Sequence, residues 1–408
     1  MKSLAIVVLV VALFSASDVF AAKQNTKPPK FEVTEIQRPQ GDVEGCLPGH
    51  HFDVYAPRMN DTPYVVGYTD CYVESNGVVS KRGWRAFAWS AATGAVSLLP
   101  LPGLDLSASA AGEVNSSGDA VGYEKTASGA IVQVRWSVSG DASRPLDPLL
   151  DCGVLGSANL IRAAINDSGD MAFRAQRSWG SYGYSTCVPV LVVADAYGQE
   201  TTTGERYFVP FAMNSSGVVA GNMGVGAVTW SAADAGVTIL HENQLEELSA
   251  ATNINDAGDV VGYILKATDS NGCATEGVGI LWMANASGGV EEILLPESKR
   301  FPVGYPLDIN PARQVVGARY MSGDCDPYLE NGQAVLWQDG AAFDLNELIP
   351  SNSGVYLRSA TSINGSGTIL ATGFVLSEGS LPCPEPADPA RMCRPRHSFL
   401  MVPKKEMK

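Results

Sequence analysis

One short segment of the chain combines aromatic side chains with small spacers. It runs from Arg177 to Tyr184 and sets Trp179, Tyr182 and Tyr184 among Gly and Ser residues. Exposed aromatic rings in such a setting suit stacking on sugar rings or contact with a protein surface. The alternative is that the same rings pack locally against the protein. The pattern therefore predicts a binding site, and it carries no catalytic group.

An acidic loop, residues 324–330, is a second candidate binding segment. It carries Asp324, Asp326 and Glu330 around Tyr328. Its carboxylates would hold a cation if they converged, and the alternative is a solvated loop without a ligand. We take Tyr328 as a fourth candidate ligand-binding residue and predict no metal site.

Catalytic motifs of known type are absent from the sequence. It has no Gly-x-Ser-x-Gly turn, no His-Glu-x-x-His pair and no Gly-rich phosphate loop. The histidines are His50, His51, His241 and His397. Adjacent side chains on an extended segment point apart, which disfavours a metal site built from His50, His51 and His397.

Carboxylates leave an enzymatic alternative open. The chain has 43 acidic residues, and the distance between two carboxylates in space decides whether they cleave a glycosidic bond. We therefore predict a non-catalytic binding protein without a cofactor, whose ligand is a protein or a glycan. The alternative is a polysaccharide hydrolase or lyase that uses carboxylates in a central funnel.

A repeated phrase indicates the scaffold that must position these segments. It consists of Asn, a short turn that usually contains Gly, and a Val/Ala-rich stretch that closes on Gly. The copies begin 41 to 55 residues apart, at Asn60, Asn115, Asn166, Asn214, Asn255, Asn310 and Asn364. A repeat of about 50 residues is typical of a β-propeller or a solenoid.

Each repeat divides into four short β-type runs. In the sixth copy these are 306–309, 314–319, 334–337 and 342–345, with turn residues between them. The third run ends on Trp in five copies, which predicts a buried position between repeats. These tryptophans are Trp89, Trp136, Trp230, Trp282 and Trp337.

The two ends of the chain predict how the array is completed. The seventh copy stops after its third run, and an unassigned β-type run, Phe31 to Ile36, precedes the first copy. Pairing of that run into the last repeat would remove the exposed edges of an open array. We therefore predict an all-β, seven-bladed β-propeller over residues 23–403, closed by its N-terminal strand, with a basic tail at 404–408.

The Asn turn itself superficially resembles a calcium loop. The helix-loop-helix type requires alternating oxygen ligands and a Glu at its twelfth position, and no copy has them. The alternative is structural: the Asn side chain accepts a backbone hydrogen bond, and Gly adopts the left-handed conformation. Gly stands at that place in five copies, and Pro63 and Arg313 are the exceptions.

Residues 1–22 have the pattern of a secretory signal peptide. Lys2 precedes an apolar run from Leu4 to Phe14, and small residues follow near Ala21. We expect a secreted or periplasmic monomer without a membrane span. The net charge of −15 disfavours nucleic acid as a partner, because the two would repel each other.

Eight cysteines in the predicted mature chain indicate disulfides in an oxidising compartment. The strand order predicts that all eight lie on the face opposite the Asn turns, together with the long insertions 69–84, 174–187, 264–278, 319–333 and 375–397. We expect pairs Cys46–Cys71, Cys152–Cys187, Cys273–Cys325 and Cys383–Cys393, among about 105 possible connectivities.

Two phrases resemble a known repeat family. Ile254 to Gly262 and Arg85 to Trp89 are similar to the HAF-type extracellular repeat of secreted bacterial proteins. The third copy departs most, with Met171-Ala172-Phe173 in place of Val-Val-Gly. The resemblance covers nearly the whole mature chain and implies a secreted, propeller-like protein. It supplies no catalytic residues.

Overall fold

The computed structural model describes most of the chain beyond its first 27 residues. The described residues are 28–37, 39, 54–62, 64–75, 78–98, 106–138, 143–146, 163–179, 186–224, 226–234, 236–242, 247–270, 274–284, 290–323, 332–378, 381–382, 392–393 and 395–404. They form β-strands and one 3-10 turn, η2 (Leu345–Glu347). Among them there is no helix long and apolar enough to cross a membrane.

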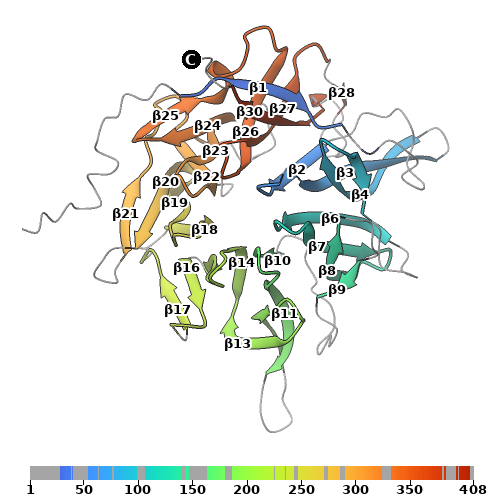
Figure 1. Cartoon of the computed structure of the whole chain (residues 1–408), viewed down its shortest axis with the longest axis vertical. Coiled ribbons are helices and arrows are strands. Elements are labelled where there is room, and N and C mark those ends of the chain that lie inside the picture. Colours follow the sequence, from blue (N-terminus) through green and yellow to red (C-terminus); the bar gives the residue numbers. More distant parts are fainter. Residues whose placement is uncertain are drawn as a thin grey trace, which may run out of the picture.

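The strands are grouped into antiparallel units of four that lie around a common centre (Figure 1). The first unit is β2 (Val54–Met59), β3 (Val65–Ser75), β4 (Val78–Ser90) and β5 (Gly94–Ser97). The second is β6 (Leu106–Val114), β7 (Asp119–Thr126), β8 (Ile131–Ser137) and β9 (Arg144–Pro145). The third is β10 (Ala163–Ile165), β11 (Met171–Trp179), β12 (Thr186–Ala194) and β13 (Glu200–Arg206).

The next units continue the same order. The fourth is β14 (Phe208–Met213), β15 (Val219–Met223), β16 (Gly226–Ser231) and β17 (Gly236–Ile239). The fifth is β18 (Leu248–Ile254), β19 (Val260–Thr268), β20 (Ala274–Ala284) and β21 (Val290–Leu294). The sixth is β22 (Val303–Ile309), β23 (Val315–Tyr320), β24 (Gln333–Gln338) and β25 (Ala341–Asp344). A single parallel pairing, Gly277 with Val303, joins the fifth and sixth units into one sheet.

The last unit contains strands from both ends of the chain. Its order is β26 (Val355–Ile363), β27 (Ile369–Val375), β30 (His397–Pro403) and β1 (Phe31–Glu35). Strand β1 pairs antiparallel with β30 from Phe31↔Pro403 to Glu35↔Phe399. A separate two-stranded ribbon consists of β28 (Leu381–Pro382) and β29 (Met392–Cys393).

Apolar side chains fill the spaces between neighbouring units. All five tryptophans of the third strands are buried there, at 8% exposure or less. Trp89, for example, packs with Leu370 and Leu400 of the last unit, and Trp136 packs with Val66 of the first. The expectation that these residues form the core between repeats is confirmed.

The Asn turns lie at one end of the units, between their first and second strands. In every copy the Asn Oδ1 accepts the N–H four residues later, at 2.8–3.0 Å. The Gly three residues after the Asn has a φ of 78° to 86° in its five copies, and Arg313 has a φ of 59°. The structural interpretation of the turn is confirmed, whereas Pro63 lies outside the described residues.

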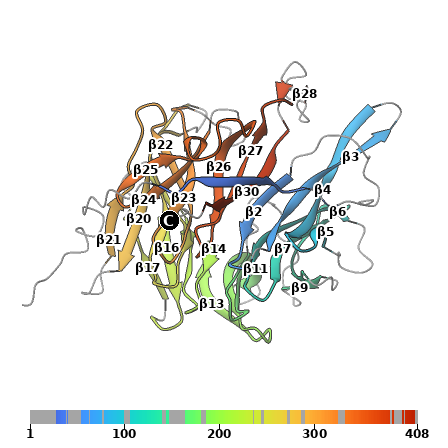
Figure 2. The same ribbon diagram turned by 45° about the horizontal axis from the view of Figure 1, so that its top comes forward.

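Several of the long insertions continue as β-hairpins. β3 and β4 remain paired through Asp70–Ser75 and Val78–Trp84, beyond the last described pair of β2 with β3, Val54↔Thr69. β11 and β12 remain paired out to Trp179↔Thr186. Figure 2 shows β3 and β4 projecting from the body. Residues with high β-propensity, such as Tyr72, Val73 and Val78, favour the extended pairing.

Candidate functional site

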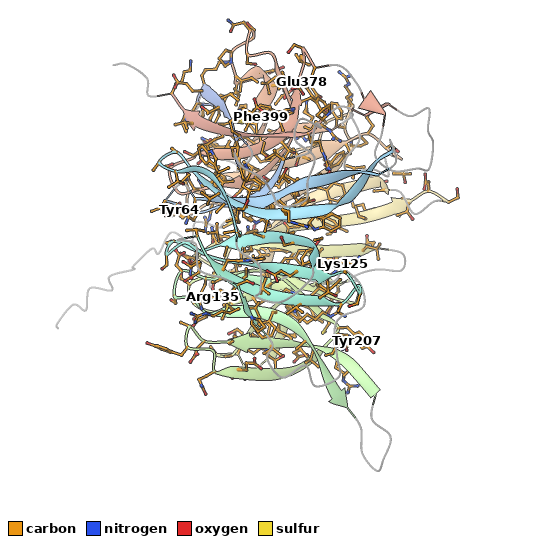
Figure 3. The ribbon with its side chains drawn as sticks, turned by 90° about the vertical axis from the view of Figure 1, so that its right-hand side faces the viewer. Tyr64, Lys125, Arg135, Tyr207, Glu378 and Phe399 are labelled. Carbon is orange, nitrogen blue, oxygen red and sulfur yellow. The ribbon has the colours of Figure 1, made fainter. Side chains whose placement is uncertain are left out.

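The two ends of the units differ in what they carry. In Figure 3, Tyr64 and Arg135 mark the end with the Asn turns, and Lys125 and Tyr207 mark the opposite end. We call the opposite end the hairpin face, because the β3–β4 and β11–β12 hairpins extend from it. The second strands run away from the Asn turns, so their far ends must lie on this face.

The predicted binding residues are described only in part. The backbone of Trp179 ends β11, paired with Thr186. Tyr182, Tyr184 and Tyr328 lie outside the described residues. The structure thus locates the start of the aromatic segment and leaves its contacts as a prediction.

The cysteines, like the predicted binding residues, are described only in part. The backbone of Cys71 lies in β3, that of Cys187 in β12 and that of Cys393 in β29. The other five, Cys46, Cys152, Cys273, Cys325 and Cys383, lie outside the described residues. Their four disulfides stay predictions.

The Asn turns form a ladder that the sequence did not predict. The side chains of the first six Asn residues, Asn60 to Asn310, also donate from Nδ2 to the backbone carbonyl of the next Asn, at 2.7–3.3 Å. Between the last turn and the first, the N–H of Gly365 donates to Asp61 Oδ1 at 2.7 Å. The same N–H-to-Asp bond joins Ser116 to Asp167 and Ser215 to Asp256. The turn end is therefore occupied by bonds between neighbouring units.

Arg313, which replaces the turn Gly in the sixth copy, bonds to the preceding turn through its side chain. It stands in the left-handed position that Gly occupies elsewhere, which strains a side chain with a Cβ. Its Nε and Nη2 lie 2.9 and 3.2 Å from the two oxygens of Asp259 in the preceding turn. The ion pair joins this turn to the preceding one.

A second unpredicted feature is a group of polar side chains on the innermost strands, which we call the central charged cluster. Each member lies two residues before an Asn of the ladder. The members are Arg58, Glu113, Asn253, Asp308 and Ser362. In the third and fourth units the same place holds Ala164 and Ala212, so the cluster occupies one arc of the centre.

Asp308 is the acceptor at the middle of this cluster. Its Oδ1 accepts from Asn253 Nδ2 at 2.6 Å and from the N–H of Ile309 at 2.8 Å. Its Oδ2 accepts from Ser362 Oγ at 2.7 Å and from the N–H of Ile363 at 2.8 Å. A carboxylate offers about four acceptor positions, and these donors fill them.

Arg58 of the first unit bonds to the second and last units. Its Nε donates to Glu113 Oε1 at 2.7 Å, and its Nη1 donates to the carbonyl of Thr361 at 2.6 Å. Burial disfavours the charged guanidinium, but Glu113 and Asp308 outweigh it and raise the pKa of Arg58. Burial raises the pKa of the Asp308 carboxyl, against the opposing effect of Arg58 and the hydrogen bonds.

The hydrogen bonds of Asp308 hold neighbouring innermost strands together. A general base must be free to accept a proton from a substrate, and the lone pairs of Asp308 already accept hydrogen bonds from within the protein. Within the described part of the chain, no three His, Cys, Asp or Glu side chains converge as a metal site. His397 instead lies between Glu35 and Glu378, at 2.7 Å from each.

Comparisons with known proteins concern the fold. No protein-family model and no curated protein matches the chain. A structure from a study of two prolyl endopeptidases is similar, with a TM-score of 0.51 and 9% identity, over 80% of this chain and 46% of that one. The chain thus spans less than half the length of that protein.

Two further solved structures are similar at lower scores. The β-propeller domain of the Trilobed protease from Pyrococcus furiosus has a TM-score of 0.49 and 8% identity, over 86% of this chain and 93% of that one. TolB from Acinetobacter baumannii has a TM-score of 0.40 and 12% identity, over 69% and 62%. At such identities likeness concerns the fold alone. The chain has an all-β, propeller-like fold.

Proposed function

We propose that the protein is a secreted or periplasmic, seven-bladed β-propeller that binds a protein or glycan ligand through its hairpin face. The blades would close into a ring through the pairing of β1 with β30. The Gly365–Asp61 bond between the last turn and the first supports the same closure. Membership of the HAF-type repeat family is part of this proposal, on the evidence of the phrases Ile254–Gly262 and Arg85–Trp89.

The observation that carries the binding proposal is the asymmetry between the two ends. At the turn end, side chains and backbone groups bond to neighbouring units through the ladder. At the other end, β11 and β12 run past the innermost strand, whose described part ends at Ala163↔Phe173. Loops and hairpins held on a rigid scaffold are where binding residues usually lie.

The predicted disulfides would brace this face. Cys71 and Cys187 both lie in the paired parts of hairpins that extend beyond the innermost strands. A disulfide that closes a loop typically contributes about 2–4 kcal/mol to the free energy of unfolding. Such bridges would keep the hairpins ordered before a ligand binds, which lowers the entropic cost of binding.

The test is capture of a ligand by the oxidised mature protein. Affinity pulldown and glycan-array screening are compared for the native chain and a variant with Trp179, Tyr182 and Tyr184 changed to Ala. Aromatic contacts often dominate binding energy, so we expect capture to fall about tenfold or more. The matched control is Tyr197→Ala, which removes a 92% exposed tyrosine in the β12–β13 turn, at the end away from the hairpins.

Two outcomes would contradict the proposal. Capture that survives in the triple variant would remove the aromatic segment from the site. Shortened polysaccharide products released by the native protein would favour the hydrolase or lyase alternative.

A further inference from the structure

The end of β1 is held by a histidine that lies between two carboxylates. His397, at the start of β30, has its Nδ1 2.7 Å from Glu35 Oε1 and its Nε2 2.7 Å from Glu378 Oε2. Glu35 is the last residue of β1, and Glu378 lies in the turn that follows β27. We call His397 and its two carboxylates the Glu–His–Glu clasp. Figure 3 labels Glu378 and also Phe399, whose ring centre lies 6.2 Å from that of His397.

The geometry of the clasp requires a proton. A carboxylate only accepts hydrogen bonds, and a neutral imidazole has a single N–H. With a neutral imidazole between two carboxylates, one ring nitrogen would direct its lone pair at a carboxylate oxygen. Both contacts are hydrogen bonds only when the three groups together hold one more proton. An imidazole takes up a proton at a higher pH than a carboxyl group does, so the extra proton belongs to His397.

Three elements bring charged groups to this place. Among the described residues, β1 supplies Glu35, and the turn after β27 supplies Glu378. On β30 itself, Arg396 precedes His397, and its guanidinium lies 6.0 Å from the centre of the Tyr55 ring in the first unit. The His397 side chain is 14% exposed, and those of Glu35 and Glu378 are 36% and 34% exposed. The clasp can therefore exchange its proton with the solvent, which also weakens each of its bonds.

The two ends of β1 are held by different kinds of contact. At its start, Phe31 is 1% exposed, and its N–H donates to the carbonyl of Leu348 at 2.9 Å. Just beyond its end, Ile36 is also 1% exposed, and its N–H donates to the carbonyl of Ser398 at 2.8 Å. The packing of Phe31 does not change near neutral pH. The clasp lies next to Ile36, so its protonation acts on the end of the strand.

We propose that the Glu–His–Glu clasp is a pH-sensitive switch that fastens the end of β1 to the last unit. The clasp is closed while His397 is protonated, and it opens as the pH rises and the imidazole loses its proton. Histidine is the side chain that changes charge between about pH 5 and 8. Ile36 belongs to the same apolar cluster as Val54 of the first unit. Opening of the clasp therefore also loosens the contact between the last unit and the first.

Amide hydrogen exchange in the oxidised mature protein tests this proposal, because it reports local opening of a strand. Exchange at Ile36 and Phe31 is measured for the native protein and for His397→Gln at pH 5.5 and 8.5. The two proteins are compared at the same pH, so that the intrinsic exchange rate cancels. At pH 5.5 we expect exchange at Ile36 to be about three- to tenfold faster in His397→Gln, because charge-assisted but partly exposed hydrogen bonds are lost. At pH 8.5 the two proteins exchange alike, and Phe31 exchanges alike at both pH values.

Two further variants separate the clasp from a general loss of stability. His241 also lies between two carboxylates, those of Glu247 and Glu292, but it joins the fourth unit to the fifth. His241→Gln is therefore the matched control and leaves exchange at Ile36 unchanged at either pH. Glu35→Gln keeps the histidine, removes one carboxylate of the clasp and accelerates exchange at Ile36 at pH 5.5, as His397→Gln does.

Three results would overturn the switch. They are an effect of His397→Gln at Ile36 that is equal at the two pH values, no effect at pH 5.5, and an effect that is as large at Phe31 as at Ile36. None of these measurements involves a ligand, so each result leaves the binding function proposed above standing.

Discussion

At the residue scale, the two glycines of the repeated phrase answer different physical demands. Gly258 provides a φ of 83° in the turn, and nothing lies within 4 Å of the place where a Cβ would be. At Gly262 an added Cβ would lie 2.0 Å from the carbonyl oxygen of Ala250 on the innermost strand. The first glycine is required by conformation and the second by space.

This difference predicts unequal effects of the same substitution. Gly258→Ala costs about 1–2 kcal/mol of the free energy of unfolding, because a Cβ destabilises the left-handed conformation. Gly262→Ala forces a backbone apart and costs more than the ~3 kcal/mol of ordinary overpacking. Urea unfolding of both variants measures the two values. Equal losses would show that β18 can move away from the added methyl group.

The structural roles of the residues in the Asn turns were only partly predictable from the sequence. The turn Asn and the left-handed Gly follow from local hydrogen bonding and backbone conformation, which a short sequence contains. The second bond of the first six Asn residues, to the next copy, depends on packing between units 41 to 55 residues apart. In the third copy, Phe173 stands where most copies have the closing glycine. The described innermost strand of that unit, β10, has three residues and pairs with β11 without a register shift.

At the scale of elements, ion pairs reinforce the contact between neighbouring units. His241 follows β17, and its Nδ1 lies 2.7 Å from Glu292 of β21. Its Nε2 lies 3.2 Å from Glu247, just before β18. Burial disfavours the charged imidazole, but the hydrogen bonds and charges of these carboxylates outweigh it and raise the pKa of His241.

A raised pKa in the folded state gives a definite dependence on pH. The stabilisation is complete below about pH 6.5, the usual value for an unfolded histidine, and is lost as the pH rises through the higher folded value. The melting temperature of the native protein should therefore exceed that of His241→Gln most at acidic pH. Thermal unfolding of both proteins from pH 5.5 to 9 measures the difference. A difference that stays constant with pH would contradict the pairing.

The strands of the repeat were predictable because period-two alternation and turn residues bound them. In the sixth unit the expected runs 306–309 and 334–337 fall within β22 and β24. The extended β3–β4 hairpin was not predicted, although the sequence contains a signal for it. Asn76-Gly77 stands between the paired residues Ser75 and Val78, and Asn-Gly is a typical two-residue hairpin turn.

At the scale of the whole molecule, segments from the two ends of the chain share one sheet. Phe31 is 1% exposed and packs in the cluster that contains Phe399 and Met401. The central charged cluster adds links between the first, second and last units through Arg58. Its members lie up to 304 residues apart, and their common position became visible only after the repeats were aligned on Asn.

Removal of the first strand should therefore destabilise the molecule. A mature chain that begins at residue 38 loses β1, exposes the edge of β30 and leaves the place of Phe31 empty. We expect a lower melting temperature and a tendency to aggregate through the free edge. Calorimetry and size-exclusion chromatography measure both effects, and a peptide of residues 28–37 should restore the melting temperature. The control is a chain that lacks only residues 405–408.

An unchanged melting temperature without β1 would mean that the last unit needs only three strands. The cohesion of the units would then depend on the Asn ladder and the central charged cluster. Variants of Asp308 would distinguish that case, because Asp308 bonds to groups on three innermost strands.

The Asn ladder also constrains the cell in which the protein can be made. Asn60, Asn115, Asn166, Asn214 and Asn364 each begin an Asn-x-Ser/Thr sequence, the acceptor for N-linked glycans. The nitrogen that would carry the sugar is Nδ2, which in Asn60, Asn115, Asn166 and Asn214 donates to the next turn. A eukaryotic secretory pathway attaches glycans to such acceptors, and a glycan there would prevent the turns from meeting. The fold is thus compatible with export only where these asparagines stay unmodified.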